Sequence, residues 1–408
     1  MATAHPHDGQ PPARPSQASQ QRSDAAWMAR ALALAERGRG HTSPNPMVGA
    51  VLVRDGKVIG EGWHQAPGQP HAEAVALAAA AAAARGATLY VTLEPCAHTG
   101  RTPPCADAVA SAGVARVVAA LVDPDPRVAG AGFRRLHAAG VELSVGDSAD
   151  AAAEQNAAYL VHRRLGRPRI TCKAAASLDG KVTAADGSSQ WITGPAARAD
   201  AHRLRAESDA VAVGSGTALT DDPGLTARPP NIEVIRPPLR VLVDTSGRVP
   251  ATARLFSSEA PTLVATTGRA SAGAREAWVR AGAEVLILPA GPHGVDLVTL
   301  VRALGERGVL ELMVEGGPTL QASLWAAGLV DRLVWYLAPI VLGGAATPGL
   351  VPGVVAPTLA AARQLQIAVV RPVGPDLRVI AYPKPVAHAP GRAAAGDRPV
   401  PASASRTL

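Results

Sequence analysis

The chain has 408 residues, 47% of them hydrophobic, so it is long enough for two domains of ordinary size, each with a buried core. Its formal net charge of +7 suits nucleic acid or small phosphorylated substrates equally well. Aromatic residues make up only 3%, which disfavours a surface that stacks many exposed bases. The composition therefore favours a small anionic ligand and predicts no nucleic-acid partner.

The chain lacks the features of a secreted or membrane protein. Its three cysteines, an odd number, do not form a disulfide framework. Residues 1–22 lack the apolar stretch of a signal peptide, and no uninterrupted apolar run of about 20 residues could form a membrane helix. We expect a cytoplasmic protein without a membrane partner, with disordered tails at 1–22 and 386–408, where Pro, Ala and other small or polar residues dominate.

The apolar runs between residues 23 and 147 alternate with helical patterns. We expect strands at Met47–Val53, Val58–His64, Thr88–Leu93, Val114–Val122 and Val141–Val145. Asp55-Gly56 predicts a hairpin turn between the first two strands. Helices are expected from Pro70 to Arg85, from Pro104 to about Gly113 and around Gly132–Ala139. This order predicts one three-layer α/β domain over residues 23–147.

A helical connector over residues 148–168 leads into a second α/β domain, over residues 169–385. Its expected strands are Ile170–Ala175, Ala210–Val213, Val241–Asp244, Thr262–Ala265, Val285–Leu288, Glu311–Val314, Val334–Ile340 and Arg378–Tyr382. Its expected helices are Pro195–Glu207, Ala272–Ala281, Val295–Arg307 and Pro318–Ala327.

The first domain carries a candidate catalytic zinc site. His71 lies at the start of a helix, and Cys96 and Cys105 each follow a proline after a strand. One imidazole and two thiolates leave the fourth position of Zn²⁺ open for water, whose pKa the metal lowers to about 7. Glu73, two residues after His71, can move the proton to a leaving amine. The combination resembles the zinc deaminases of nucleobases.

Two alternatives to this site involve only structure. The cysteines could be unrelated core residues, or a structural zinc knuckle could use His98, the only nearby fourth ligand. Cys172 lies in an apolar strand of the second domain and is interpreted as a core residue.

Eight residues separate Cys96 from Cys105, whereas two are usual in such deaminases. The segment Glu94-Pro-Cys-Ala-His-Thr-Gly-Arg-Thr-Pro-Pro-Cys105 instead resembles the deaminase half of the bifunctional riboflavin-biosynthesis deaminase/reductase family, as do Ser43-Pro-Asn-Pro-Met-Val-Gly49 and Pro70-His-Ala-Glu73. The resemblance implies a cytidine-deaminase-like fold and a base contact from Asn45. The alternative for Asn45, which stands between two prolines, is a turn residue.

The second domain has polar, glycine-rich strand ends, where α/β folds bind nucleotides, but no GxGxxG motif. Lys173-Ala-Ala-Ala-Ser-Leu-Asp-Gly180, Ser189-Gln-Trp-Ile-Thr193, Val213-Gly-Ser-Gly-Thr217, Asp221-Asp-Pro-Gly-Leu-Thr226 and Val314-Glu-Gly-Gly-Pro-Thr-Leu320 resemble the reductase half of the same family. That half has a dihydrofolate-reductase-like fold and uses NADPH.

The reductase resemblance implies two sets of contacts. NADPH contacts are implied at Ala175, Trp191, Thr217, Asp221, Thr245, Gly317, Pro318, Thr319, Leu320, Gln321, Ala322 and Ser323. Substrate contacts are implied at Lys173, Ser189, Arg205, Leu225, Arg228 and Glu315. Arginine offers a planar fork to phosphate, and Trp191 can cover a ring. The alternatives are a solvated helix face for Arg205 and a core position for Trp191.

The family implies deamination of 2,5-diamino-6-(5-phosphoribosylamino)pyrimidin-4-one and then NADPH reduction of the ribosyl chain of 5-amino-6-(5-phosphoribosylamino)uracil to ribityl. It also implies a homo-oligomer. Three rival functions are a deaminase whose reductase-like domain is inactive, a nucleic-acid editing deaminase and a non-enzymatic zinc module. The cysteine spacing and the lack of basic or aromatic clusters disfavour the second, and Glu73 has no purpose in the third.

Overall fold

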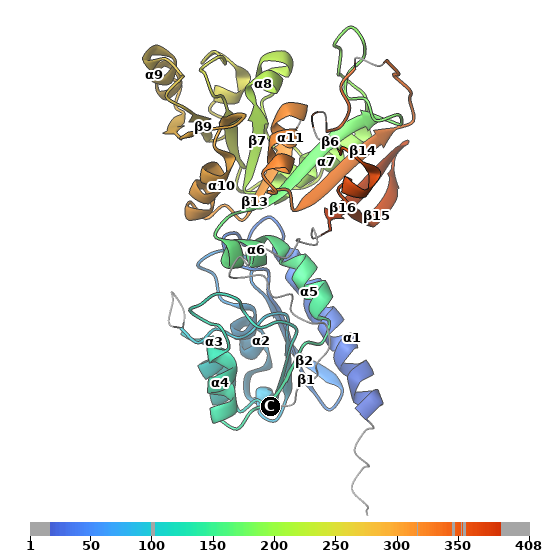
Figure 1. Ribbon diagram of the computed structural model, residues 1–408. Helices are drawn as coiled ribbons and strands as arrows, with labels where there is room; N and C mark the ends of the chain where they lie inside the picture. The colour runs from blue at the N-terminus through green and yellow to red at the C-terminus, as the bar shows by residue number, and fades with distance from the viewer. Residues whose placement is uncertain are drawn as a thin grey trace, which may run out of the picture. The chain divides into compact units, whose positions relative to one another are not determined.

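The computed structural model describes residues 17–384, except 99–102, 316, 345–346, 352 and 354–355, and the side chains of 17–20 (Figure 1). Contacts divide these residues into two compact units, one of residues 17–38 and 47–155, the other of residues 39–46 and 156–384. Within the described residues, no helix combines the length and apolar character that crossing a membrane requires.

The first unit is a three-layer α/β fold around a five-stranded sheet of order β2-β1-β3-β4-β5. Strand β1 is antiparallel to β2 and β3, whereas β3, β4 and β5 are parallel. Its elements are α1 (Gln17–Ala35), β1 (Gly49–Arg54), β2 (Lys57–Trp63), α2 (Ala72–Ala80), β3 (Thr88–Val91), α3 (Cys105–Ser111), β4 (Arg116–Ala119), α4 (Ala131–Ala138), β5 (Glu142–Val145) and α5 (Ala149–Gln155), with 3₁₀ turns at Glu36–Gly38 and Ala81–Ala84.

Alternation along the central strands forms the two cores of this unit. Ala50 and Leu52 of β1 pack with α2, α3 and α4, whereas Val51 and Val53 face α1 and α5. Successive strand residues point to opposite faces, so one strand contributes to both cores. The expected Asp55-Gly56 turn is confirmed, since both residues have positive φ angles of 52° and 69°.

The second unit contains a nine-stranded sheet of order β10-β9-β8-β7-β13-β6-β14-β16-β15 and a short β11-β12 hairpin. Its strands are β6 (Arg169–Ser177), β7 (Ala210–Gly214), β8 (Leu239–Val243), β9 (Thr262–Thr266), β10 (Glu284–Ile287), β11 (Ala290–Gly291), β12 (Gly294–Val295), β13 (Glu311–Glu315), β14 (Arg332–Ala338), β15 (Leu365–Val373) and β16 (Asp376–Pro383). Its helices are α6 (Ala157–Leu165), α7 (Pro195–Glu207), α8 (Ser215–Asp221), α9 (Ala272–Arg280), α10 (Leu297–Glu306) and α11 (Pro318–Ala326), with 3₁₀ turns at Arg254–Phe256 and Leu359–Ala361.

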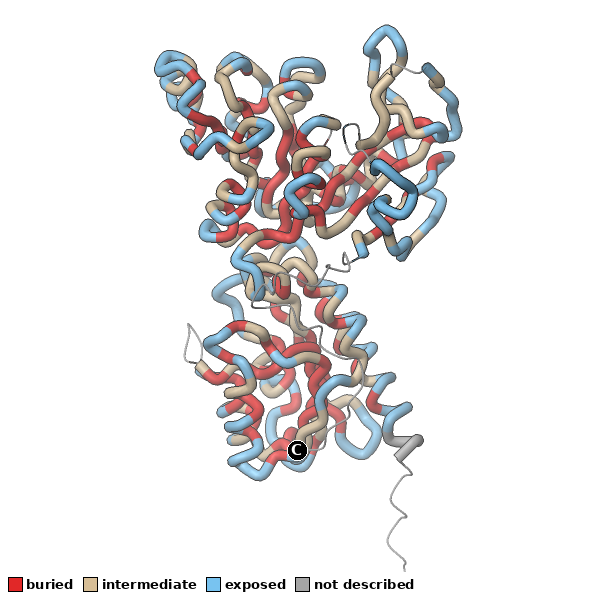
Figure 2. Tube along the Cα trace, in the orientation of Figure 1, coloured by how far each residue is buried: buried red, intermediate tan, exposed pale blue. Residues whose placement is uncertain are grey.

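Helices cover both faces of this larger sheet. Strand β7 directs Ala210 and Ala212 toward the core shared with α10 and α11, and Val211 and Val213 toward the core that includes residues of α7 and α9. Seven neighbouring strands of this sheet, in the order β10-β9-β8-β7-β13-β6-β14, are parallel. Their carboxyl ends therefore meet at one edge of the sheet. Buried residues concentrate along the central strands (Figure 2).

The expected helices and strands are all present, with ends shifted by a few residues, and the expected connector holds α5 and α6. Helix α1 begins at Gln17, so the disordered tail expected over residues 1–22 is wrong for residues 17–22. The rest of that tail and residues 386–408 lie outside the described residues. Helices α1 and α8, strand β15 and the β11-β12 hairpin were not predicted.

Candidate functional site

Two glycines of β2 let helix α2 pack directly on the strand and place His71. A Cβ at Gly60 would lie 2.2 Å from the carbonyl oxygen of Ala76, and one at Gly62 would lie 2.3 Å from that of Ala72. Real Cβ atoms do not approach so closely, so larger residues would push the helix away from the sheet. His71 is the N-cap of α2, and its place depends on this close packing.

Backbone contacts fix the two cysteines at neighbouring positions. The Glu94 carboxylate accepts hydrogen bonds from the backbone N–H groups of Asp123, Gly130 and Gly132, at 3.2, 3.0 and 2.9 Å, and so holds the segment before Cys96. Cys105 is the first residue of α3, and its backbone N–H donates to the Cys96 Sγ at 3.4 Å.

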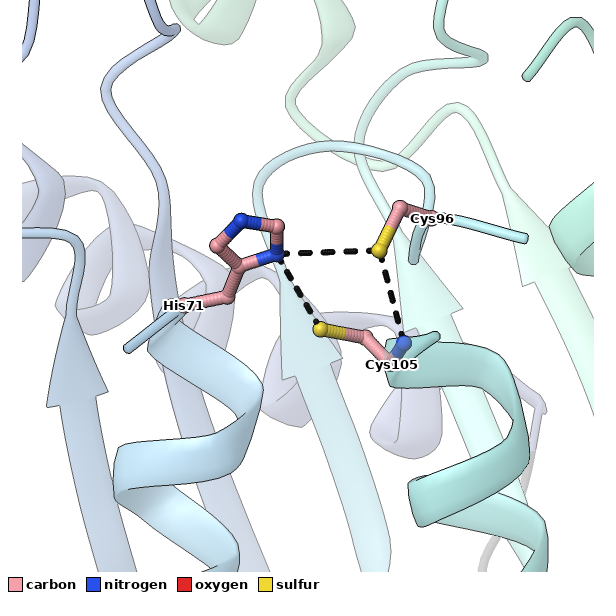
Figure 3. A group of neighbouring side chains, drawn as sticks. All are labelled: His71, Cys96 and Cys105. Carbon is pink, nitrogen blue, oxygen red and sulfur yellow. Dashed lines mark hydrogen bonds between the residues drawn. The ribbon is translucent and has the colours of Figure 1, made fainter. Parts of the chain in front are cut away.

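The three predicted ligands converge, as Figure 3 shows. His71 Nδ1 lies 3.3 Å from the Cys105 Sγ and 3.6 Å from the Cys96 Sγ. These are the only three His, Cys, Asp or Glu side chains in the described part of the chain whose ligand atoms form such a group, so His98 is not a fourth ligand there. One imidazole and two thiolates with an open fourth position fit the donor set of a catalytic zinc site.

The pKa values of the two thiols shift in opposite directions because the side chains lie so close together. A hydrogen bond from Cys105 lowers the pKa of Cys96 to about 4 against the effect of burial, and His71 adds to the shift. Conversely, the hydrogen bond to Cys96, burial and the nearby Glu73 carboxylate all raise the pKa of Cys105. Because metal ligation requires thiolates, binding of zinc would release the Cys105 proton.

Glu73 lies in the first turn of α2 and is only 3% exposed. Burial raises the pKa of its carboxyl to about 7, although its own backbone N–H and His71 oppose the shift.

His64 lies beside His71 but was not among the predicted site residues. Its Nδ1 lies 3.2 Å from the carbonyl oxygen of Pro70, and its ring meets that of His71 edge-on at 5.5 Å.

The second unit contains a cavity of about 1610 Å³ at the carboxyl edge of its sheet. All the predicted substrate contacts of the reductase line it: Lys173, Ser189, Arg205, Leu225, Arg228 and Glu315. Every predicted NADPH contact except Ala322 also lines it: Ala175, Trp191, Thr217, Asp221, Thr245, Gly317, Pro318, Thr319, Leu320, Gln321 and Ser323. The structure thus gathers residues from distant parts of the chain.

A buried charged triad forms one wall of this cavity. Arg205 donates from Nε and Nη2 to the two carboxylate oxygens of Glu315, the latter bond being 2.8 Å, and from Nη1 to the Thr226 carbonyl at 3.1 Å. The Lys173 Nζ lies 3.7 Å from Glu315 Oε2. Burial alone would raise the pKa of Glu315, but attraction and hydrogen bonding to Arg205, aided by Lys173, lower it to about 2.

The alternatives for two cavity residues are wrong. Arg205 is not on a solvated helix face, since its side chain is 17% exposed and paired. Trp191 is not a core residue, because it is 69% exposed, with the Arg198 guanidinium 4.7 Å from its ring centre. Gly317 has a positive φ of 60° before Pro318, and a Cβ there would lie 2.9 Å from the Thr217 Oγ1.

Several cavity residues were missed by the sequence reasoning. They include Arg198, His202 and Arg248. The His202 Nδ1 accepts from the backbone N–H of Arg228 at 3.2 Å. These residues have no short motif that would single them out.

Asn45, the predicted base contact of the deaminase site, lies in a turn. Its backbone N–H donates to the Thr42 carbonyl at 2.8 Å. The contact between Asn45 and the base stays a prediction.

Comparisons with known proteins agree with both sites. Residues 21–121 match the cytidine and deoxycytidylate deaminase zinc-binding region, and residues 168–379 match the RibD C-terminal domain. The riboflavin biosynthesis protein RibD of Escherichia coli K12 is 46% identical over 366 residues, which cover 87% of this chain and 98% of that protein. The Bacillus amyloliquefaciens protein of the same name is 40% identical, covering 88% and 96%.

Solved structures give the same result for the fold. Acinetobacter baumannii RibD has a TM-score of 0.82 and 38% identity, covering 90% of this chain and all of its own. A diaminohydroxyphosphoribosylaminopyrimidine deaminase/5-amino-6-(5-phosphoribosylamino)uracil reductase from Thermotoga maritima has a TM-score of 0.79 and 30% identity, with the same coverage. The expected fold classes, cytidine-deaminase-like and dihydrofolate-reductase-like, are confirmed. The chain belongs to the RibD family of riboflavin biosynthesis proteins.

Proposed function

We propose that the chain catalyses two consecutive steps of riboflavin biosynthesis. It deaminates 2,5-diamino-6-(5-phosphoribosylamino)pyrimidin-4-one and then reduces the ribosyl chain of 5-amino-6-(5-phosphoribosylamino)uracil to ribityl with NADPH. One observation supports this pair above all: a His-Cys-Cys group beside a buried glutamate shares a chain with a cavity that collects the reductase residues. The matched families are a zinc-binding deaminase and the RibD reductase domain.

In the deaminase site, His71, Cys96 and Cys105 would hold the zinc ion. When bound, zinc would supply a water of pKa about 7 as the nucleophile. The Glu73 carboxylate takes the proton of the attacking water and delivers it to the leaving amino nitrogen, so that ammonia departs. Its burial excludes bulk water from this proton transfer. Asn45 is proposed to contact the base.

In the reductase site, bound NADPH would supply a hydride to the C1′ carbon of the ribose, while the bond from C1′ to the ring oxygen breaks and that oxygen takes up a proton from solvent. Gly317, Thr319 and Leu320 line the cavity where α11 begins, and their backbone N–H groups suit the dinucleotide phosphates. Trp191 is exposed and can cover a ring, and Arg228 offers its guanidinium to the substrate phosphate. The Lys173–Arg205–Glu315 triad orients the sugar, because its charges are fixed by one another.

The decisive experiment supplies the phosphoribosylated diaminopyrimidine to the zinc-loaded full chain, with and without NADPH. Ammonia release and NADPH oxidation are followed separately. We expect ammonia in both reactions, and NADPH oxidation that follows deamination. Ammonia release without any NADPH oxidation would favour the rival function, a deaminase with an inactive reductase-like domain. The lining of the cavity opposes that rival, since the predicted contacts other than Ala322 are assembled.

We also propose the setting in which the enzyme works. Zinc ligation by Cys96 and Cys105 needs reduced thiols, which supports a cytoplasmic location. The partner is the small phosphorylated pyrimidine, without nucleic acid or membrane. A homo-oligomer is supported by the outermost strand β15, where Ile367 is 63% and Val370 57% exposed. Analytical ultracentrifugation of the full chain measures the oligomeric state, and a monomer at all concentrations would contradict this part.

A further inference from the structure

Two side chains of helix α7 hold the loop that carries Arg228. This loop, residues 222–238, joins α8 to β8 and contains no helix or strand. Arg205 donates from Nη1 to the Thr226 carbonyl at 3.1 Å, and the His202 Nδ1 accepts from the backbone N–H of Arg228 at 3.2 Å. His202 and Arg205 are three residues apart, so they lie on the same side of the helix. One side of α7 therefore bonds a carbonyl and an N–H group of the loop backbone.

The loop adopts a conformation here that needs support from its neighbours. Leu225 has a φ of 50°, in the left-handed region that a leucine adopts only at a cost in free energy. Leu225 and Thr226 are buried, whereas Arg228 is exposed and lines the cavity. The two bonds from α7 thus help to fix where the loop presents the Arg228 guanidinium.

The bond from the Arg228 backbone requires a neutral His202 ring. A nitrogen that accepts a hydrogen bond carries no proton, so the ring keeps its single proton on Nε2. The charged groups that face the ring are Arg205 on its own helix, Arg228 on the loop and Glu315 on β13. Burial and the two arginines lower the pKa of His202 from 6.5, against the effect of Glu315, so the ring is neutral at pH 7. Protonation in acid would set an N–H group at Nδ1 against the N–H group of Arg228 and break the bond.

We propose that His202 is a positioning residue of the reductase, whose neutral ring holds the Arg228 backbone so that the guanidinium meets the substrate phosphate. Protonation of His202 releases this part of the loop, so the substrate binds more weakly in acid while kcat stays the same. The two quantities separate because the phosphate takes no part in the bonds that change at C1′, so its contact acts alike before and during hydride transfer. The proposal rests on the reductase function proposed above and adds to it a residue that acts through Arg228.

The test measures kcat and KM for NADPH oxidation on 5-amino-6-(5-phosphoribosylamino)uracil, with the zinc-loaded full chain at saturating NADPH. His202→Asn keeps an acceptor oxygen near the place of Nδ1 but cannot be protonated, whereas His202→Leu removes the acceptor. At about pH 8, the KM of His202→Asn should lie within about twofold of the wild-type value. The KM of His202→Leu should rise about three- to tenfold with kcat unchanged, the expected effect of losing one hydrogen bond.

The pH profile separates this role from structural support of the loop. A phosphate monoester itself titrates at about pH 6, so the KM of every form rises in acid. The ratio of the wild-type KM to the His202→Asn KM removes this common effect and should increase about twofold or more as the pH falls to about 5. His293→Asn is the matched control, because His293 is another histidine that lines the cavity, and its KM should follow that of the wild type at each pH.

The Kd of NADP⁺, measured by calorimetry, reports that the cavity of each variant is intact, and it should stay within about twofold of the wild-type value. Should His202→Leu lose NADP⁺ binding, the comparison of wild type with His202→Asn decides alone. A KM ratio that does not change with pH overturns the proposal for His202, as does a kcat that falls in His202→Leu with KM unchanged. A wild-type chain that oxidises no NADPH on this substrate overturns the reductase function as well.

Discussion

Replacing Glu315 by glutamine should destabilise the second unit strongly at neutral pH and only weakly in acid. The Glu315 side chain is 8% exposed and its partner Arg205 is 17% exposed, so solvent screens the pair little. In Glu315→Gln the guanidinium of Arg205 and the ammonium of Lys173 stay buried without their counterion. Breaking a buried ion pair in this way costs about 3–5 kcal/mol.

The pKa of Glu315 gives a second measure of the same interaction. It falls from 4.5 to about 2 in the folded chain. At about 1.4 kcal/mol per pKa unit, this shift corresponds to about 3 kcal/mol. Because the folded pKa is lowered, the stabilisation is complete above the unfolded value of 4.5 and disappears as the pH falls toward about 2.

The assay is urea unfolding of wild type and Glu315→Gln at pH 7, 4 and 3, followed by tryptophan fluorescence. We expect a stability difference of about 3 kcal/mol at pH 7 that shrinks steadily toward pH 3. Glu276→Gln is the control, because Glu276 is 68% exposed and its pair with Arg280 should contribute no more than about 1 kcal/mol. A difference that is equal for both variants, or that does not change with pH, would refute the assigned ion pair.

Three further changes test the deaminase site. Glu73→Gln should lower the rate of ammonia release about 10²–10⁴-fold, because the proton carrier is lost, while the zinc content stays unchanged. Cys96→Ser should lose zinc and ammonia release together, as metal analysis of the purified chain would show. Gly62→Val should shift α2 and His71, lowering zinc affinity and destabilising the first unit by about 1–3 kcal/mol in thermal unfolding.

NADPH oxidation on the already deaminated substrate is the internal control for these three variants, since the reductase residues lie in the other unit. It should persist in each of them. Ammonia release that survives Glu73→Gln would remove Glu73 from the mechanism. Full zinc content in Cys96→Ser would show that the ligand set is wrong, and wild-type zinc affinity in Gly62→Val would show that α2 tolerates the added side chain.

Much of the fold could be predicted because its strands are regular. Continuous apolar runs such as Gly49–Arg54 and Ala210–Gly214 are buried on both faces, and glycine occurs in turns beside them, so strand positions follow from the pattern alone. Helix α1 escaped prediction because its buried residues, such as Met28 and Ala31, follow a polar first part rich in Gln and Ser. Strand β15 escaped prediction because its sequence, Leu-Gln-Ile-Ala-Val-Val-Arg-Pro-Val, has no regular alternation of apolar and polar residues.

The sequence by itself identified the three candidate zinc ligands, which the structure brings together, and the glutamate beside them. His71 and Glu73 share one helical turn, and a metal site accepts few residue types, so spacing and chemistry sufficed. Only the tertiary structure decided how the reductase charges are paired. Arg205 and Glu315 are 110 residues apart, and the sheet order brings them together on one wall. The exposure of Trp191 and the approach of Arg248 to Ser215 likewise depend on which strands become neighbours, and no local pattern encodes that choice.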